Sequence, residues 1–343
     1  MDTQNDIILE LKNVKVQFKL DEGILKAVDG VSFPLYKGKT LGIVGESGCG
    51  KSVTSNAILK ILPYYGHIEG DILLYEKNGV RQNPPINIAK LNPTGKEIRD
   101  IRGGNIAMIF QEPMKAFSPI HTVGNQIMEA ILLHVEKDEK KARQMIIDLF
   151  NKVGISNPEQ RINEYPHQLS GGMRQRAMIA MALSCNPSIL IADEPTTSLD
   201  VTVQAQVLDL INGLKRDMNT SIIFITHDLG VIAEMSDYVA VMYLGKIVEY
   251  CDVDTLFYNP LHPYTRALLG SIPTASKGHK ERFTSIQGTV PYPINLPDQC
   301  GFYTRCELAN NGKCYSGQVP ILEVEPGHFV SCQQVQPIEE GVG

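Results

Sequence analysis

The stretch Thr40–Ser52, Thr-Leu-Gly-Ile-Val-Gly-Glu-Ser-Gly-Cys-Gly-Lys-Ser, joins an apolar run to a glycine-rich loop that ends in a lysine and a serine. Its second part, Gly45–Ser52, fits the pattern G-x-x-x-x-G-K-[ST]. The apolar run Thr40–Val44 predicts a buried strand, and a helix is predicted from Lys51 to Leu62. A strand, a loop of this pattern and a helix in that order indicate a binding site for the phosphates of a nucleotide.

The residue types in this loop are those that an anion site requires. Glycines let the backbone turn tightly, so that successive N–H groups point inward, and the positive end of the following helix adds to their field. Lys51 is expected to reach the β- and γ-phosphates, and the Ser52 hydroxyl to ligate Mg²⁺. The predicted nucleotide contacts of the loop are Gly45, Ser47, Gly48, Cys49, Gly50, Lys51, Ser52 and Val53.

Two adjacent carboxylates follow a second apolar run. Ile189–Ala192 predicts a buried strand, and Asp193 and Glu194 come directly after it. Such a pair can divide the work, because one carboxylate holds the magnesium ion while the other accepts a proton from the attacking water. A solvated acidic pair at a strand end is the alternative, but the pair and the loop together predict that the bound nucleotide is hydrolysed, with Asp193 on the metal and Glu194 as the base.

The order of the other predicted elements indicates an α/β fold. Short apolar strands alternate with helical segments in the second half, which is typical of a largely parallel sheet covered by helices. Near the N-terminus, two segments with alternating apolar and polar residues predict a pair of strands joined by an acidic turn. The predicted strands are Ile7–Phe18, Gly23–Phe33, Ser221–Thr226 and Tyr238–Tyr243, and the predicted helices are Val203–Met218 and Leu229–Met235.

Two further segments differ from this core. Val123–Leu133 and Lys140–Val153 are helical in period and predict a helical insert, and Asn83–Asn87 and Asn92–Pro93 predict a loop before it. Prolines from Pro260 onward predict a loop-rich tail. We therefore expect a P-loop NTPase (RecA-like) core, with a parallel sheet and an antiparallel β part, over residues 1–112 and 181–258, a helical subdomain over residues 113–180, and a loop-rich extension over residues 259–343.

Bulk properties narrow the possible partners of this chain. Its 343 residues carry a net charge of −6 and a pI of about 5.8, which argues against nucleic acid as the main partner. No run approaches the ~18 consecutive apolar residues of a membrane span. The polar start Met1–Asp6 lacks the basic and then apolar order of a secretory signal. We therefore expect the chain on the cytosolic side, with any membrane role exerted through a partner.

A motif in the predicted helical insert identifies the family. Leu169-Ser-Gly-Gly-Met-Arg-Gln-Arg176 resembles the signature motif of ATP-binding-cassette proteins, with Met173 where glutamine is commoner. Ser170 is placed to cap a helix whose first N–H groups remain open beside Gly171 and Gly172. The resemblance implies that these three residues press on the γ-phosphate of ATP held by a second ATPase subunit, either another copy or a paralogue. Two ATP molecules with Mg²⁺ would then join two subunits head to tail.

Other residues match the same family in order and position. Phe18 resembles the aromatic residue that stacks on adenine, although an ordinary core phenylalanine is the alternative. Gln111 resembles the glutamine that senses Mg²⁺ and the attacking water. Ser198-Leu199-Asp200 resembles the loop that contacts the opposite subunit, and His227 resembles the histidine that contacts the γ-phosphate. The predicted catalytic residues are Lys51, Gln111, Glu194 and His227, and the predicted magnesium ligands are Ser52, Gln111 and Asp193.

Three segments favour a particular class of transporter. His121–Gln126, His262–Leu268 and Pro326–Cys332 resemble the ATPase subunits of dipeptide and oligopeptide importers. That resemblance implies two membrane permease subunits as partners, an extracytoplasmic peptide-binding protein as an indirect one, and a peripheral location at the cytoplasmic face of the membrane. Nickel importers are closely related, but their ATPase subunits often lack the cysteine-rich end. A soluble cassette ATPase or a non-catalytic regulatory subunit are further alternatives.

Four cysteines gather near the end of the chain. Cys300, Cys306, Cys314 and Cys332 are separated by five, seven and seventeen residues. In a reducing cytosol such a group favours metal ligation over disulfides, but the closely spaced pairs of zinc sites are absent. Four thiolates also suit a [4Fe–4S] cluster. A similar Cys-x₅-Cys-x₇-Cys run in the peptide-importer ATPases implies such a cluster, and zinc, free thiols and disulfides remain the alternatives.

Overall fold

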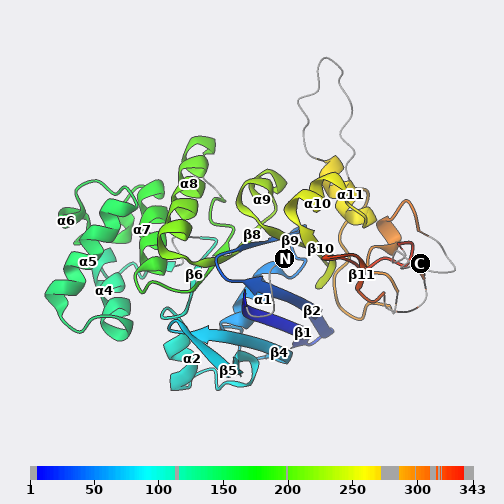
Figure 1. Ribbon diagram of the computed structural model, residues 1–343, viewed down its shortest axis with the longest axis horizontal. Coiled ribbons are helices and arrows are strands. Elements are labelled where there is room, and N and C mark those ends of the chain that lie inside the picture. Colours follow the sequence, from blue (N-terminus) through cyan, green and yellow to red (C-terminus); the bar gives the residue numbers. More distant parts are fainter. Residues whose placement is uncertain are drawn as a thin grey trace, which may run out of the picture.

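The computed structural model of the chain describes residues 6–112, 116–197, 200–271, 286–297, 299–309, 314–315, 317 and 319–335. Two sheets form its centre, with helices at one end and the C-terminal segment at the other (Figure 1). The smaller sheet has the order β2 (Gly23–Tyr36), β1 (Ile7–Leu20), β4 (Gly66–Lys77) and β5 (Val80–Asn87). The larger has the order β11 (Leu322–Glu325), β12 (His328–Val330), β10 (Lys246–Asp252), β9 (Tyr238–Tyr243), β3 (Thr40–Val44), β8 (Ser221–Thr226), β7 (Ile189–Asp193) and β6 (Ile106–Ile109).

Five neighbouring strands of the larger sheet, β9, β3, β8, β7 and β6, run parallel. They are buried on both faces, which explains why their sequences are continuous apolar runs rather than alternating ones. The carboxyl ends of β3, β8, β7 and β6 therefore meet at one edge of the sheet, where open α/β sheets bind their ligands. The predicted α/β core with a parallel sheet is confirmed, as is its antiparallel part.

The smaller sheet is antiparallel and corrects one prediction. Asn83–Asn87, predicted as a loop, belongs to the strand β5. Pro84 and Pro85 are tolerated there because β5 is the outer strand of the sheet, so that one side of its backbone needs no partner. Between the two sheets, the buried side chains of both form one apolar core with α1 (Lys51–Ile58).

Helices gather at the end of the molecule beyond β6 (Figure 1). Their apolar faces share a second core with the outer face of β6, β7 and β8. Side chains cap four of them: Thr122, Asp138, Ser170 and Asp200 each accept a hydrogen bond from a first-turn N–H. These helices are α4 (Val123–His134), α5 (Glu139–Lys152), α6 (Pro158–Arg161), α7 (Gly171–Leu183) and α8 (Val201–Met218).

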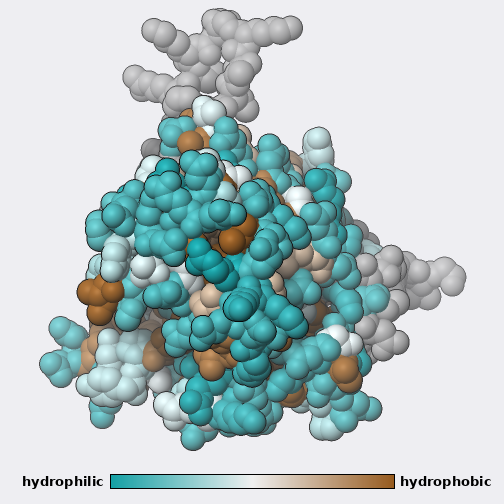
Figure 2. Space-filling model, turned by 90° about the vertical axis from the view of Figure 1, so that its left-hand side faces the viewer, coloured by the Kyte–Doolittle hydropathy of each residue, from teal (hydrophilic) through white to brown (hydrophobic). Residues whose placement is uncertain are grey.

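The outer surface of this helical end is largely hydrophilic, with apolar residues in small separate groups (Figure 2). None of the helices in the described ranges is both long and apolar enough to cross a bilayer. Shorter helices complete the fold: α2 (Lys96–Ile101), α9 (Leu229–Met235), α10 (Val253–Tyr258), α11 (Pro263–Gly270) and the 3₁₀ turns η2 (Ile88–Lys90), η3 (Pro166–Gln168) and η4 (Tyr303–Arg305).

The C-terminal segment is joined to the core more closely than a loop-rich extension would be. Its hairpin β11–β12 pairs with β10 and so continues the larger sheet. Phe302 and Tyr264 are buried with side chains of β9 and β10 in a third core. The predicted extension therefore contains strands of the main sheet, although much of it is irregular.

A buried carboxylate anchors this junction. Glu249 of β10 is fully buried and accepts hydrogen bonds from the backbone N–H groups of Leu261 (2.7 Å) and His262 (3.0 Å). Nε2 of His328, on β12, lies 2.8 Å from the same carboxylate. Burial would raise the pKa of Glu249, but the hydrogen bonds together outweigh it, so its pKa lies below the ordinary value. The ionised carboxylate thus stabilises the docked C-terminal segment.

We expect Glu249→Gln to lower the free energy of unfolding at neutral pH by about 2 kcal/mol, because a charge that three donors stabilise is lost. The depressed folded pKa contributes stability that is present above the unfolded pKa and is lost as the pH falls through the folded one. The difference from the wild type should therefore shrink in acid. Thermal unfolding across a pH series measures it, with the exposed Glu234→Gln as control. Equal stabilities of wild type and Glu249→Gln at pH 7 would contradict this account.

Candidate nucleotide site

At two positions of the loop after β3, other backbone segments come so close that only glycine fits. At Gly45, a Cβ would meet the carbonyl oxygen of Met242 at 2.2 Å, and at Gly50, where φ is +105°, it would meet that of Ala27 at 2.4 Å. Any side chain at either position would push the loop off the sheet. Gly50 also precedes the first turn of α1, so its left-handed conformation directs the chain into the helix.

Lys51 and Ser52 lie where the loop enters α1. The Lys51 ammonium group is buried and donates to the carbonyl oxygens of Gly45 (2.7 Å) and Glu46 (3.3 Å), so it lies inside the loop. The Ser52 hydroxyl donates to Oδ1 of Asp193 at 3.1 Å. This contact joins the end of β7 to the loop after β3, as the predicted magnesium site requires.

The surroundings of Asp193 suit a carboxylate that binds a cation. It is the last residue of β7 and is almost completely buried. Burial raises its pKa, and the negative charge of Glu194 raises it further, while the Ser52 hydroxyl lowers it. A desolvated carboxylate and a hydroxyl 3.1 Å apart suit a hard cation with oxygen ligands, such as Mg²⁺.

Glu194 is held in a restricted conformation. Its φ is +46°, in the left-handed region that a non-glycine residue rarely adopts, and its N–H donates to the carbonyl of Ile225 on β8 at 2.9 Å. The turn directs its carboxylate toward one side chain of the same turn and side chains from two other segments. Gln111 donates to Oε2 (2.9 Å), as does Thr197 (3.0 Å), and Nδ1 of His227 lies 3.3 Å from Oε1.

These contacts set the charge of Glu194. Burial would raise its pKa, but the hydrogen bonds from His227 and Thr197 outweigh that effect, so the pKa lies below the ordinary value. The carboxylate is therefore ionised at neutral pH and able to accept a proton. The structure thus brings Gln111, Glu194 and His227 together at the ends of β6, β7 and β8, and their catalytic roles stay a prediction.

Phe18 lies in β1 with only 8% of its surface exposed, packed into the central core. Its ring and that of Tyr65 meet edge to face, with 5.7 Å between ring centroids. Tyr65 in turn meets Tyr64, whose surface is 99% exposed. The predicted stacking of Phe18 on adenine stays a prediction. An exposed pair of tyrosines beside it was not found from the sequence.

The signature segment, Leu169–Arg176, is separated from the phosphate loop, Gly45–Ser52, of its own chain. Figure 1 places α7 among the helices at one end, away from α1. Its cap, Ser170, is exposed and accepts from the N–H of Met173 at 3.2 Å, and a Cβ at Gly171 would meet no atom within 4 Å. Gly172 lies beside Val203, near the start of α8, which Asp200 caps. Ser198 and Leu199 lie outside the described residues.

The four C-terminal cysteines border the same small cavity. It is lined by Cys300, Cys306, Cys314 and Cys332 together with His262 and Phe302, and the N–H of Cys300 donates to the carbonyl of Cys314 at 3.1 Å. Burial raises the pKa of the Cys300, Cys306 and Cys332 thiols, and mutual repulsion between the sulfurs adds to it. In the described part of the chain, however, no three His, Cys, Asp or Glu side chains are placed to ligate one metal ion. The four predicted cysteine ligands therefore line one cavity, but they are not arranged around a single metal ion.

Three further residues near the site were not predicted from the sequence. Thr197 reaches Glu194 from within the same turn, and a hydroxyl three residues after a carboxylate is a weak signal for such a contact. Tyr264 and Arg305 reach Glu46 of the loop from positions more than 200 residues further along the chain. Nothing in the local sequence marks contacts at that separation.

Comparison with known proteins gives consistent matches. Residues 28–197 match the family model described as ABC transporter, and residues 248–314 match that for the C-terminal region of oligopeptide/dipeptide transporters. The dipeptide transport ATP-binding protein DppD of Bacillus subtilis is 49% identical over 95% of this chain and 94% of its own length. The oligopeptide transport ATP-binding protein AppD of the same organism is 47% identical over 95% and 96%.

The fold also matches solved structures. A dimeric structure of the bacterial ABC transporter cassette MJ0796 superposes with a TM-score of 0.60 at 25% identity, covering 71% of this chain and 98% of that one.

Thr197→Val removes the hydroxyl that donates to Glu194 while it keeps the side-chain shape. We expect turnover of ATP to fall about tenfold, because a misdirected base costs rate, with ATP affinity within about twofold of the wild type. Loss of a donor to the carboxylate also raises the pKa of Glu194, so the acidic limb of the pH–rate profile should move to higher pH. Thr197→Ser, which keeps the hydroxyl, is the matched control. An unshifted profile in the valine variant would remove Thr197 from this role.

Proposed function

This chain belongs to the ATP-binding-cassette transporter family and hydrolyses ATP, and on that premise we propose that it powers the import of dipeptides or oligopeptides through partner permease subunits. The observation that carries the peptide assignment is the match of residues 248–314 to the C-terminal region of oligopeptide/dipeptide transporters. Full-length similarity to DppD and AppD, which spans the cysteine-bearing end, supports it.

The geometry of the site supports a role for each residue in ATP hydrolysis. Backbone N–H groups of the loop and Lys51 would bind the phosphates, while Ser52, Asp193 and Gln111 would hold Mg²⁺. A magnesium ion held there would neutralise the charge that develops on the phosphate oxygens. Glu194 accepts the proton of the attacking water, and Gln111 and His227 orient that carboxylate before they contact the water and the γ-phosphate. Phe18 is proposed to contact the adenine.

A second subunit is proposed to complete the site. Ser170, Gly171 and Gly172 present the exposed start of α7, whose N–H groups and positive dipole suit an anion. Because this segment lies away from its own phosphate loop, the γ-phosphate it binds is that of the partner subunit. Asp200 caps α8, whose Val203 lies beside Gly172, and Val201 in the same first turn is highly exposed. These features favour a head-to-tail pair around two ATP molecules.

The permease contact is proposed near residues 111–122, of which 113–115 lie outside the described residues. Gln126 of α4 fixes this segment, because its side chain bonds both the N–H and the carbonyl of Ser118 and the carbonyl of His121. Ile120 projects from it with 75% of its surface exposed. Ile120 follows Gln111 by nine positions and lies on a loop that Gln126 holds in place. It is therefore suited to transmit a change at the γ-phosphate to a membrane partner at the cytoplasmic face.

Glu194→Gln tests the hydrolytic assignment. We expect ATP binding within about twofold of the wild type and hydrolysis lower by about 10²–10⁴, because the amide cannot accept the proton. Filter binding and phosphate release measure the two. Wild-type turnover in the variant would exclude Glu194 as the base.

The same variant tests transport in the native host. After deletion of the gene, uptake of labelled dipeptides or oligopeptides should fall, return with the wild-type gene and stay low with the Glu194→Gln gene. Loss of nickel uptake with intact peptide uptake would favour a nickel importer. Unchanged uptake of both would favour a soluble cassette ATPase.

We propose that the four C-terminal cysteines hold an iron–sulfur cluster. All four line one cavity, and their separations of five, seven and seventeen residues lack the closely spaced pairs of zinc sites. A larger cluster with one cysteine on each of four irons spans more widely separated thiolates. Such a cluster would contribute folding free energy to a segment with little regular structure.

Protein purified without oxygen should then contain iron and acid-labile sulfide and show a visible absorption band that dithionite bleaches. Cys306→Ser should lose the iron, while Cys251→Ser, a buried cysteine of β10 outside the group, should retain it. Stoichiometric zinc without iron, or equal iron in both variants, would overturn the cluster assignment.

A further inference from the structure

The phosphate loop carries a negative charge of its own. Glu46 is the second residue of the loop, and its backbone carbonyl accepts from Lys51 Nζ at 3.3 Å and from the N–H of Cys49 at 3.3 Å. A carboxylate at this position opposes the binding of a triphosphate, because like charges at short range repel each other. Something must compensate Glu46 for the loop to accept ATP.

Arg305 supplies that compensation from the C-terminal segment. Its guanidinium group binds the Glu46 carboxylate through two parallel hydrogen bonds, Nη1 to Oε2 at 2.6 Å and Nη2 to Oε1 at 3.0 Å. Only 3% of the Arg305 side chain is exposed, while 28% of the Glu46 side chain is, so water screens this pair only in part. A bidentate pair of this kind is among the strongest charged hydrogen bonds in proteins.

The remaining donors of Arg305 are also satisfied. Nε donates to the carbonyl of Gln287 (2.9 Å), Nη2 to that of Gly288 (3.4 Å), and Nη1 to the hydroxyl of Tyr243 (3.4 Å). Its five hydrogen bonds match the five N–H donors of a guanidinium group. The rings of Tyr243 and Phe302 lie 5.8 and 6.0 Å from its central carbon. These contacts fix the orientation of the Arg305 guanidinium group, in addition to the charge pairing with Glu46.

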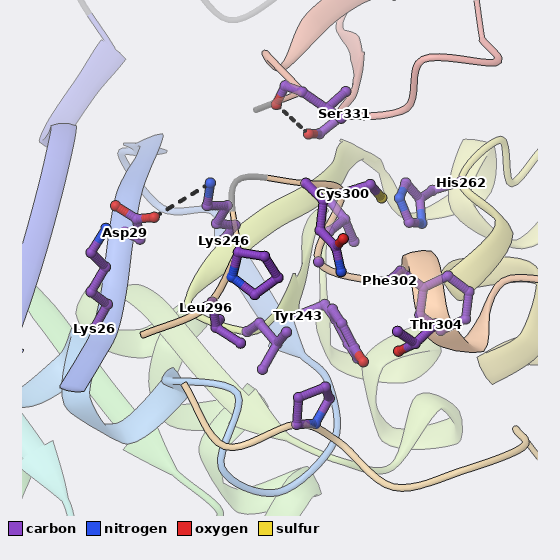
Figure 3. A pocket seen from close by; sticks show the side chains of 17 residues that line it. Lys26, Asp29, Tyr243, Lys246, His262, Leu296, Cys300, Phe302, Thr304 and Ser331 are labelled. Atoms are coloured by element: carbon purple, nitrogen blue, oxygen red, sulfur yellow. Dashed lines mark hydrogen bonds and ion pairs between the residues drawn. The ribbon is translucent and has the colours of Figure 1, made fainter. Parts of the chain in front are cut away.

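A second contact from the same region holds the backbone of Glu46. Its N–H donates to the hydroxyl of Tyr264, a fully buried residue of α11, at 2.9 Å. The rings of Tyr264, Tyr243 and Phe302 pack against one another, with centroid separations of 4.7 to 5.3 Å. Tyr243 and Phe302 also form a wall of the adjacent cavity of about 450 Å³ (Figure 3). The residue after Gly45 is therefore held at both its side chain and its N–H.

In the sequence, Arg305 lies between Cys300 and Cys306, two of the four C-terminal cysteines. It ends the turn η4, whose start is fixed by a hydrogen bond from the N–H of Tyr303 to the carbonyl of Cys300, and Cys306 follows directly. Whatever orders Cys300 and Cys306 therefore orders Arg305 as well. This gives the C-terminal segment a direct connection to the phosphate loop.

We propose that Arg305 is a positioning residue of the nucleotide site, which neutralises Glu46 and thereby couples ATP affinity to the folding of the C-terminal cysteine segment. The inference rests on ATP binding at the phosphate loop. Arg305 does not touch the reacting atoms, so its loss affects the binding of ATP more than the rate at saturation.

Arg305→Met leaves Glu46 charged and without its partner, and Glu46→Gln removes the charge with little change of shape. We expect the dissociation constant and KM for Mg·ATP to rise about tenfold or more in Arg305→Met, with kcat within about threefold of the wild type. Glu46→Gln removes the repulsion and keeps the positive charge of Arg305, so it should bind ATP more tightly than Arg305→Met does. The double variant should recover most of the affinity that Arg305→Met loses. Titration with a fluorescent ATP analogue and steady-state hydrolysis measure these values.

Arg266→Met is the matched control, since Arg266 is an exposed arginine of α11 whose guanidinium donates to the carbonyl of Pro260, and it should bind ATP as the wild type does. Should Arg305→Met fail to fold, Arg305→Lys replaces it, with an intermediate loss that Glu46→Gln again relieves. Wild-type affinity in the Arg305 variant, or a double variant as weak as Arg305→Met alone, overturns the proposal. A wild-type protein that binds no ATP would instead remove the nucleotide site itself.

Discussion

The architecture of this chain depends on holding a polyanion beside its own carboxylates. Asp193, Glu194 and Glu46 all lie at or next to the phosphate loop. Asp193 needs a cation because it is desolvated. Glu194 is kept ionised by donors from three segments, and Glu46 is neutralised by an arginine. Each negative charge thus has a separate compensation.

Sheet topology explains how these groups reach one place. Parallel strands put their carboxyl ends at the same edge, so the turns after β3, β6, β7 and β8 deliver the loop, Gln111, Asp193–Glu194 and His227 without long connections. The antiparallel strands added beyond β9 carry the C-terminal segment along the same sheet. That continuity lets a residue near position 300 contact the loop near position 46.

Local patterns predicted most of this core. β3, β8, β9 and α9 have the bounds expected from apolar runs and helical periodicity, because buried strands and amphipathic helices leave direct marks in the sequence. β5 was predicted as a loop because two prolines conceal an edge strand. The partners of Glu46 escaped prediction for a different reason. Contacts across more than 200 residues depend on tertiary packing, and an arginine in an irregular segment has no local signature.

The central claim is that one subunit binds the phosphates while its neighbour supplies the signature segment. Mixing two inactive variants tests it most directly: Lys51→Ala, which damages the phosphate loop, and Ser170→Arg, which damages the start of α7. In a mixed pair, the loop of the Ser170→Arg chain faces the intact signature of the Lys51→Ala chain, so ATP hydrolysis should reappear on mixing although neither variant is active alone. If the mixture stays as inactive as its components while the wild type hydrolyses ATP under the same conditions, the site is not shared between subunits and the account is wrong.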